Sequence, residues 1–337
     1  MQLFFSFCIL LFYMNIYGQP VKIEIIDVYG NRKIDAKTIR SQLGINEGDS
    51  IEQVVEKKQF IIEKLQQLPG VVKADLALIC CDDSANNWIV FAGVTETPGS
   101  FIYNTAPTAE ISLPAEITNA NDSFFVALMA AVQNGNGDED RSQGHSLMKD
   151  SASRRQQQKF ILYAQKYFPL LQQVLHTSAD PAQRAIAAMV IAYAEDKNKM
   201  VKELIPAVYD ADDDTRNNAT RAIAVLLEAA EKKPGLLKEK IPAEPFIDMI
   251  NSVIWTDRNK GLAVLLPLTR DTATITLLKQ KALPSLYEMA AWKNPGHALY
   301  AYLIVGRMAG FHDEQVMDTF YTDKRSIFLQ EMINKIK

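Results

Sequence analysis

The sequence predicts a two-domain protein, in which a small α+β domain with the element order βααββ precedes an all-α solenoid. Residues 21–28 alternate apolar and polar side chains, as a strand with one buried face does. A long amphipathic helix pattern then stops at Pro69-Gly70, and two stretches with strand character follow it. From Arg184 onward, four similar segments recur at intervals of 37, 39 and 37 residues, which indicates stacked helix pairs.

The bulk composition limits the classes of function. With 337 residues, 48% of them hydrophobic and 23% charged, the chain is long enough for two folded domains. The formal net charge of −4 leaves no basic footprint for a phosphate backbone, which argues against a nucleic-acid partner.

The first 18 residues form an apolar run that is short for a membrane span. We interpret residues 1–18 as a signal peptide of an exported protein, with an uncleaved membrane anchor as the alternative. Cys8 would leave with this peptide, so Cys80 and Cys81 would be the cysteines that remain. Adjacent cysteines allow a strained vicinal disulfide or two thiols, and no disulfide scaffold is predicted.

Residues 20–97 are expected to form the small domain. Asp35 is placed to cap a short helix that Gly44 ends, and Ser50 has capping-box spacing with Gln53 at the start of the long helix. The strand candidates after Pro69-Gly70 are "VVKADLALIC" and "WIVFAGVTE", joined by a polar loop.

This combination, and the junction "LPGVVKADLAL" above all, resembles a POTRA (polypeptide-transport-associated) domain. The resemblance implies a periplasmic module that binds other polypeptides of the cell envelope, often by adding a strand to a sheet edge. A simple spacer between the second domain and a partner is the alternative. Since no long series of alternating strands follows residue 115, the chain is not expected to be an outer-membrane barrel.

Residues 98–156 are expected to form a linker with one helix, "SFFVALMAAV", capped by Asn121-Asp122. The polar, Gly-rich stretch after this helix predicts a mobile loop. Its alternating Asn and Asp residues begin like a calcium loop, but Glu139 stands where the turn needs Gly and His145 where it needs a bidentate Glu. No metal site is predicted, and His145 is a weak candidate for a functional loop residue.

Residues 157–310 carry the repeated segments, which begin at Arg184, Arg221, Lys260 and His297. A second amphipathic segment precedes each of them, and Pro169, Pro206 and Pro284 predict kinks in three of these segments. The stretch "LIPAVYDADDDTRNNATRAIAVLL", with its turn aspartates and Arg216, is similar to HEAT repeats. The third and fourth copies depart from the pattern. Residues 311–337 are expected to be C-terminal capping helices.

Two tryptophans lie five residues before the third and fourth aligned starts and are expected on one partly exposed ridge. Tryptophan beside arginine is typical of interface hot spots. The candidate partner-binding residues are Trp255, Asp257, Arg258, Asn259, Trp292, Asn294 and His297. In the alternative, the two indoles seal the turns between repeats and the polar groups cap helices.

The sequence contains none of the common motifs for a metalloprotease, a serine hydrolase, a phosphate-binding loop or a CxxC redox centre. No cofactor and no catalytic residue is predicted. The composite expectation is a periplasmic scaffold that binds other proteins. An enzyme or small-ligand binder with a cleft on the helical domain, and a passive structural spacer, are the alternatives.

Overall fold

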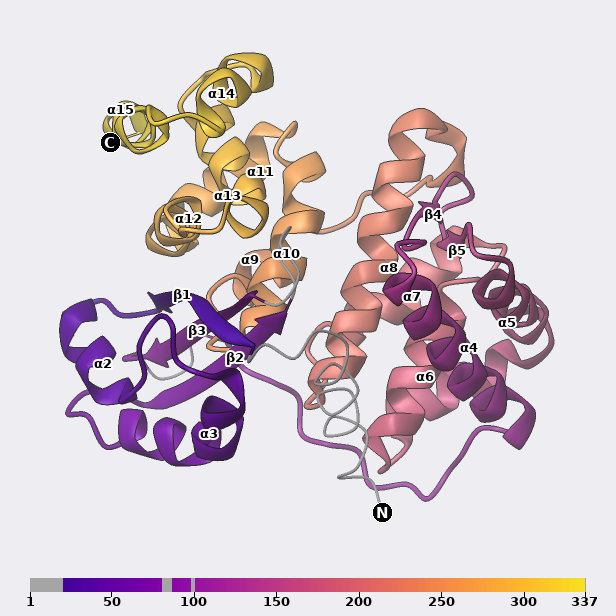
Figure 1. The fold of residues 1–337 in the computed structure, drawn as a ribbon. Coiled ribbons are helices and arrows are strands. Elements are labelled where there is room, and N and C mark those ends of the chain that lie inside the picture. Colours follow the sequence, from indigo (N-terminus) through magenta and orange to yellow (C-terminus); the bar gives the residue numbers. More distant parts are fainter. Residues whose placement is uncertain (1–20, 81–86, 98–100, 337) are drawn as a thin grey trace. The chain divides into compact units, whose positions relative to one another are not determined.

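A computed structural model describes residues 21–80, 87–97 and 101–336. The predicted signal peptide, Cys8 and Cys81 lie outside these residues. A small mixed three-stranded sheet near the N-terminus precedes a helical region, which confirms the coarse fold prediction (Figure 1). The chain divides into two compact units. Unit 1 contains the described residues of Met1–Ser100, Ser252–Trp255 and Pro284–Lys337, and unit 2 contains Phe101–Asn251 and Thr256–Leu283.

The N-terminal part of unit 1 has the predicted order of strands and helices. In the sheet, β3 is central, with β1 parallel to it on one side and β2 antiparallel to it on the other. The elements are β1 (Lys22–Tyr29), α2 (Ala36–Leu43), α3 (Ile51–Gln66), β2 (Lys73–Cys80) and β3 (Asn87–Thr95). Cys80 is exposed at the end of β2.

The predicted caps form at both ends of α2 but not at the start of α3. The Asp35 carboxylate accepts a hydrogen bond from the backbone N–H of Lys37, and Gly44 ends α2 in the left-handed conformation with φ 64°, as predicted. Ser50 stands at the N-cap of α3, but its side chain makes no hydrogen bond to the backbone of the helix. The predicted capping box at Ser50 is therefore wrong.

Both faces of β3 are buried. One face joins the core formed with α2 and α3, to which Val90, Ala92 and Val94 contribute. On the other face, Phe91 is fully buried, and a Cβ atom at Gly93 would lie 2.5 Å from the Tyr29 hydroxyl oxygen. Glycine at position 93 therefore permits a close approach that no larger residue allows.

The second face of β3 contacts segments from the C-terminal part of the chain. The Tyr29 hydroxyl donates a hydrogen bond to the backbone carbonyl of Val253 at 2.6 Å, and Phe91 packs against Trp292. These contacts place the sheet and the C-terminal helices in one unit, so the boundary differs from the one predicted at residue 97. The helices are α12 (Leu283–Ala290), α13 (Pro295–Met308), α14 (Asp313–Phe320) and α15 (Arg325–Ile336).

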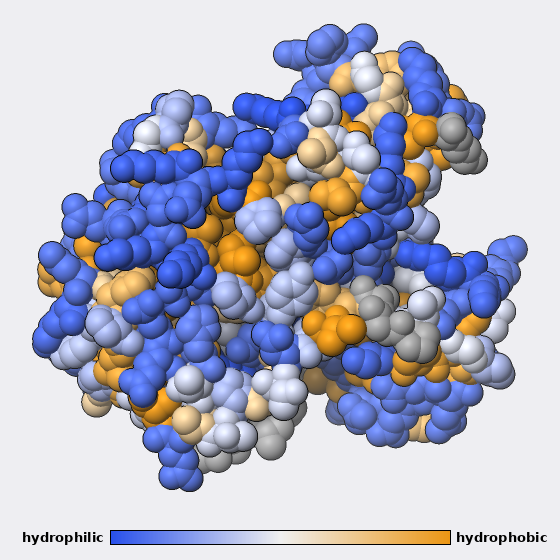
Figure 2. All heavy atoms as spheres, turned by 180° about the vertical axis from the view of Figure 1, so that it is seen from behind, coloured by the Kyte–Doolittle hydropathy of each residue, from blue (hydrophilic) through white to orange (hydrophobic). Residues whose placement is uncertain are grey.

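Unit 2 begins with an extended segment, residues 101–114, and is otherwise mainly helical, with one short hairpin. In chain order it contains α4 (Ala115–Gln133), β4 (Glu139–Asp140), β5 (Leu147–Met148), α5 (Ser151–Thr177), α6 (Pro181–Ile191), α7 (Lys197–Ala207), α8 (Asp213–Lys232), the 3-10 helix η2 (Pro234–Leu236), α9 (Glu244–Met249), most of α10 (Trp255–Leu268) and α11 (Thr272–Lys281). Hydrophilic residues cover most of the face shown in Figure 2, and hydrophobic residues form smaller groups within it.

Three predictions for the segment before the repeats are wrong. The first helix begins at Ala115, so Asn121-Asp122 lies inside α4 and does not cap it. The loop after it is not a mobile linker, because β4 and β5 pair as a short hairpin whose Leu147 and Met148 are buried. Finally, α5 begins at Ser151, since the Asp150 carboxylate caps it through the backbone N–H of Ser153.

The predicted proline kinks are confirmed at one of three positions. Tyr167, two residues before Pro169, has non-helical angles and divides α5. Pro206 is the penultimate residue of α7, where no later turn of helix remains to be bent. Pro284 is the second residue of α12, a position at which proline fits a helix.

The helix starts differ from the predicted starts of the similar segments. The helices α6, α8, α10 and α13, which contain the predicted starts, begin at intervals of 32, 42 and 40 residues. In the first three of them the fourth residue is an arginine, namely Arg184, Arg216 and Arg258, and each arginine is buried. The predicted starts at Arg221 and Lys260 lie inside α8 and α10 and do not follow the helix starts, because similar Ala- and Leu-rich runs overlap at several offsets.

Candidate functional site

The predicted ridge tryptophans lie in an aromatic cluster inside unit 1. Phe91 of β3 is the centre of this cluster: its ring centroid lies 5.4 Å from that of Trp255, 4.8 Å from Trp292 and 5.6 Å from His297. Trp255 and His297 meet edge to face at 5.0 Å. Tyr29 of β1 packs edge-on against Trp292 at 5.9 Å. The cluster joins the sheet to the turns that precede α10 and α13.

Burial corrects the expectation of a partly exposed ridge. Trp255 is 6% exposed and Trp292 is 2% exposed, so neither indole can reach a partner in this fold. The Asn294 carboxamide accepts a hydrogen bond from the backbone N–H of His297 and caps α13. Trp255, Trp292 and Asn294 agree with the alternative prediction, in which the indoles are buried at turns and the polar groups cap helices. Both indoles also pack against Phe91 of the sheet, which the sequence did not indicate.

Asp257 and Arg258, which belong to unit 2, are also buried, and Asn259 is half-buried. The Asp257 carboxylate accepts hydrogen bonds from Nε of Arg216 at 2.9 Å and from its Nη2 at 3.1 Å. The Tyr103 hydroxyl donates a third bond to this carboxylate at 3.2 Å. Burial alone would lower the pKa of Arg216, but Asp257 outweighs burial and raises it.

A second pair of the same kind precedes this one. Arg184 donates from Nε and Nη2 to the Asp210 carboxylate at 2.9 and 2.8 Å. The backbone carbonyl of Asp210 then accepts a hydrogen bond from Nη1 of Arg216 at 2.9 Å. Asp210 therefore links two successive arginines. These buried polar residues hold helix pairs together and are not free to bind a partner.

A segment of the same chain runs along the outer side of β1. Along β1, the Ile23 N–H donates to the carbonyl of Asp49 at 2.9 Å, and the Ile23 carbonyl accepts from the N–H of Gly48 at 2.7 Å. Further along, Glu47 accepts from the N–H of Ile26 at 3.2 Å. The chain itself thus occupies the outer side of β1. The strand β2 forms the other end of the sheet and pairs with β3 on one side.

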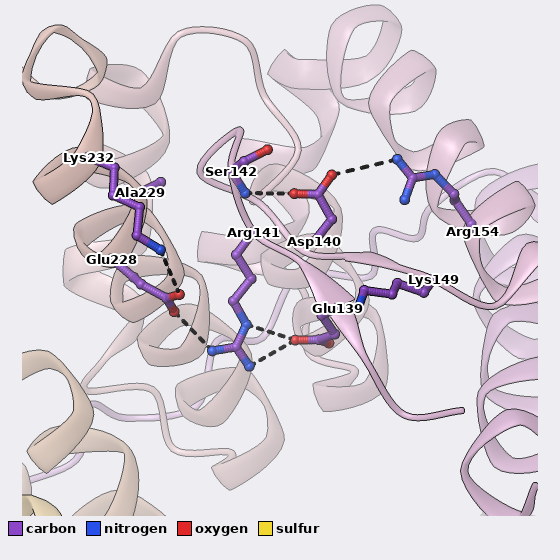
Figure 3. A pocket seen from close by; sticks show the side chains of 9 residues that line it. All are labelled: Glu139, Asp140, Arg141, Ser142, Lys149, Arg154, Glu228, Ala229 and Lys232. Atoms are coloured by element: carbon purple, nitrogen blue, oxygen red, sulfur yellow. Dashed lines mark hydrogen bonds and ion pairs between the residues drawn. The ribbon is translucent and has the colours of Figure 1, made fainter. Parts of the chain in front are cut away.

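A polar pocket of about 530 Å³ lies between the hairpin and helices α5 and α8 (Figure 3). The residues that line it are Glu139, Asp140, Arg141, Ser142, Lys149, Arg154, Glu228, Ala229 and Lys232. Arg141 is central, since it forms ion pairs with Glu139 at 2.9 Å and with Glu228 at 3.0 Å. These two pairs join the hairpin to α8.

Glu139 is the best-shielded carboxylate of this pocket. Burial acts to raise its pKa, but Arg221 and Arg141 outweigh burial and lower it. Arg221 of α8 also donates a hydrogen bond to Glu139. Charged residues on three elements thus neutralise each other, and Ala229 is the one apolar residue among those that line the pocket. The sequence signal for this docked hairpin was the apolar pair Leu147-Met148 within a polar stretch.

The loop candidate His145 lies next to a buried lysine. Its Nδ1 is 3.3 Å from Nζ of Lys197, which also donates to the carbonyl of Ala192 at 3.1 Å. Burial, followed by the Lys197 charge, lowers the pKa of His145 to about 4, and burial lowers the pKa of Lys197 to about 8. At neutral pH His145 is therefore a neutral acceptor that helps to satisfy the lysine.

This pair predicts that acid destabilises the fold below the usual pKa of histidine. Between pH 6.5 and 4 the unfolded chain binds a proton at His145 that the folded chain does not, so stability falls as the pH is lowered, by up to about 3 kcal/mol. Lys197→Met should reduce this loss, because the lysine charge is the second cause of the shift. Urea unfolding followed by circular dichroism across this pH range measures both effects.

Lys199→Met provides the matched control, because Lys199 is exposed on the same helix. This variant should keep the acid dependence of the wild-type protein. An unchanged acid loss in Lys197→Met would show that its charge does not act on His145.

Across residues 21–80, 87–97 and 101–336, no three side chains of His, Cys, Asp or Glu are grouped so that they could hold a metal ion. Within the same residues, no helix combines the length and the apolar character that a membrane crossing requires.

Comparison with known proteins adds no family. No protein-family model matches the chain, and no curated protein matches it.

Proposed function

We propose that the protein is a non-catalytic scaffold of the cell envelope, in which a POTRA-like module binds an extended segment of another polypeptide at the edge strand β2. The observation that carries this proposal is the position of β2 at one end of the three-stranded sheet, beside the central strand β3. At the other end of the sheet, residues 47–51 run along β1, and both faces of β3 are buried. An edge strand offers backbone hydrogen bonds to an incoming strand.

The order of elements supports the POTRA-like assignment. One parallel and one antiparallel strand flank β3, and α2 and α3 cover one face. This arrangement agrees with the resemblance carried by "LPGVVKADLAL", in which a long helix ends and the edge strand begins.

The helical region would present a second binding surface as a HEAT-like array. The support is the repeated arginine at the fourth position of α6, α8 and α10, together with the Asp210 and Asp257 carboxylates that Arg184 and Arg216 bind. Such arrays form extended surfaces from repeated units. Export to the periplasm, by a signal peptide in residues 1–18 that is cleaved or retained as an anchor, belongs to the same proposal.

Site-specific photo-crosslinking in the producing cell tests the edge-strand function. A photoreactive residue at Lys73, exposed in β2, should form an adduct with an envelope polypeptide. The same probe at Lys57, exposed on α3, is the matched control and should not form this adduct. Equal adducts from both positions, or none from Lys73, would remove β2 as the binding edge.

A second candidate function is a small-ligand binder or enzyme, which the pocket of about 530 Å³ beside the hairpin favours. Arg154 lies 3.8 Å from Asp140, a long separation for an ion pair, so its guanidinium could also bind a new anionic partner. Titration with inorganic phosphate or succinate at constant ionic strength tests this candidate. Loss of binding in Arg154→Gln would support it, and binding that is unaffected by this change would not.

A further inference from the structure

The outer side of α4 and α5 in unit 2 exposes apolar side chains beside basic ones. Val126 of α4 is 69% exposed and Leu162 of α5 is 63% exposed. The two helices run antiparallel, because Glu116 near the start of α4 pairs with Lys166 of α5 and Phe124 contacts Phe160. Val126 and Lys159 therefore lie at about the same height along the axes of the two helices.

Two cations belong to this surface. Arg155 and Lys159 are exposed, and with Leu162 they follow the spacing i, i+4, i+7 on α5, ahead of the kink at Tyr167. Neither cation forms an ion pair with any part of the chain that the structure describes. Asp122, one turn before Val126, is an exposed acid on α4, so the surface is basic on balance. We call Val126, Arg155, Lys159 and Leu162 the basic face.

A surface of opposite charge is formed in unit 1 by α14 and its C-cap residue Tyr321. Glu314, Met317, Asp318 and Tyr321 are exposed and follow the spacing i, i+3, i+4, i+7, and Tyr321 is 67% exposed. Glu314 and Asp318 also have no ion-pair partner among the described residues. The sequence of α14 contains no basic residue. We call these four residues the acidic face.

From these two faces we propose that the protein associates with itself head to tail, the basic face of one copy binding the acidic face of the next. A helix at the end of a stacked array needs a polar outer side to remain soluble alone. The first helix pair of unit 2 and α14 near the C-terminus both expose large apolar side chains instead. Their charges are complementary. Each face carries charges of one sign, so pairing of two identical faces would bring like charges together.

A head-to-tail contact uses two different surfaces and leaves one of each free on every pair. Association then either closes into a ring, in which every face is paired, or continues as an open chain. Apolar contacts between the faces would supply attraction, and the charges would set the partner and the direction. The edge strand β2 takes no part, so this inference stands or falls independently of the proposed function.

Charge reversal with the full chain tests the inference. Sedimentation velocity across a dilution series should show wild-type oligomers that dissociate on dilution. Arg155→Glu/Lys159→Glu and Glu314→Lys/Asp318→Lys should each weaken association by about 100-fold, because like charges then meet. A 1:1 mixture of the two variants should associate again, since each reversed face finds a face of opposite charge on the other variant.

Lys57→Glu/Lys58→Glu is the matched control, with the same change of charge at exposed positions on α3. It should associate like the wild type. The inference is overturned if the wild type is monomeric throughout the series, if the control dissociates equally, or if the mixture of reversed variants remains monomeric. Continued self-association of Glu314→Lys/Asp318→Lys would also overturn it, in favour of pairing between two basic faces.

Discussion

Replacing Trp292 with alanine should lower the free energy of unfolding by about 3–5 kcal/mol, the range for removing a buried aromatic side chain. The indole is buried between Phe91 of β3 and Tyr29 of β1, so its loss leaves a cavity between the sheet and the C-terminal helices. Urea denaturation followed by circular dichroism measures the change. Hydrogen exchange of the β3 amides should accelerate in the same variant.

Phe60→Ala is the control for this substitution. Phe60 is an aromatic residue of α3 that is largely exposed, and its removal should cost about 0.5 kcal/mol or less. A loss below about 1 kcal/mol for Trp292→Ala would contradict the packing of the sheet on the C-terminal helices, because a cavity of this size always costs more.

Replacing Asp257 with asparagine should destabilise the protein by about 3–5 kcal/mol, because it leaves the buried guanidinium of Arg216 without its counter-charge. The side chain keeps its shape, so the cost arises from charge and hydrogen bonding and not from packing. The Arg216 guanidinium also lies 4.2 Å from the centre of the Tyr103 ring, which does not replace a carboxylate. Chemical denaturation at neutral pH measures the loss.

The double variant Asp257→Asn/Arg216→Met completes a thermodynamic cycle. Removing both charges should cost less than removing Asp257 alone, since an apolar side chain has no need of a counter-ion. Additive costs of the two single changes would show that the pair contributes no coupling energy. Asp271→Asn is a control: Asp271 caps α11 at an exposed position and asparagine caps a helix about as well as aspartate, so this change should cost about 0.5 kcal/mol or less.

The sequence predicted the strands and helices of the small α+β domain well. It did not predict which distant segments pack on the sheet. Asp35, Gly44 and Pro69-Gly70 act within a few residues of where they stand, so their effects follow from local chemistry. The burial of β3 on both faces depends on residues more than 150 positions away. A clue was present in "WIVFAGV", a nearly continuous apolar run of the kind that strands covered on both sides have.

The candidate site residues were judged by composition, and composition does not distinguish a surface cluster from a buried one. Tryptophan beside arginine and aspartate occurs at interfaces, but Arg258 and Asp257 here are buried inside unit 2. The arginine at the fourth position of three helices was visible in the sequence. It was missed because the alignment followed the apolar runs, which shift easily, and not the helix starts, which fix the direction of each side chain.

The double use of Asp210 limits how the helical region can change its length. Its carboxylate binds Arg184, which precedes it in the chain, and its backbone carbonyl binds Arg216, which follows it. Deleting the segment that carries Asp210 would leave Arg184 buried without its acid. A change in the length of the segment between Arg184 and Arg216 would therefore have to keep Asp210 within reach of both guanidinium groups.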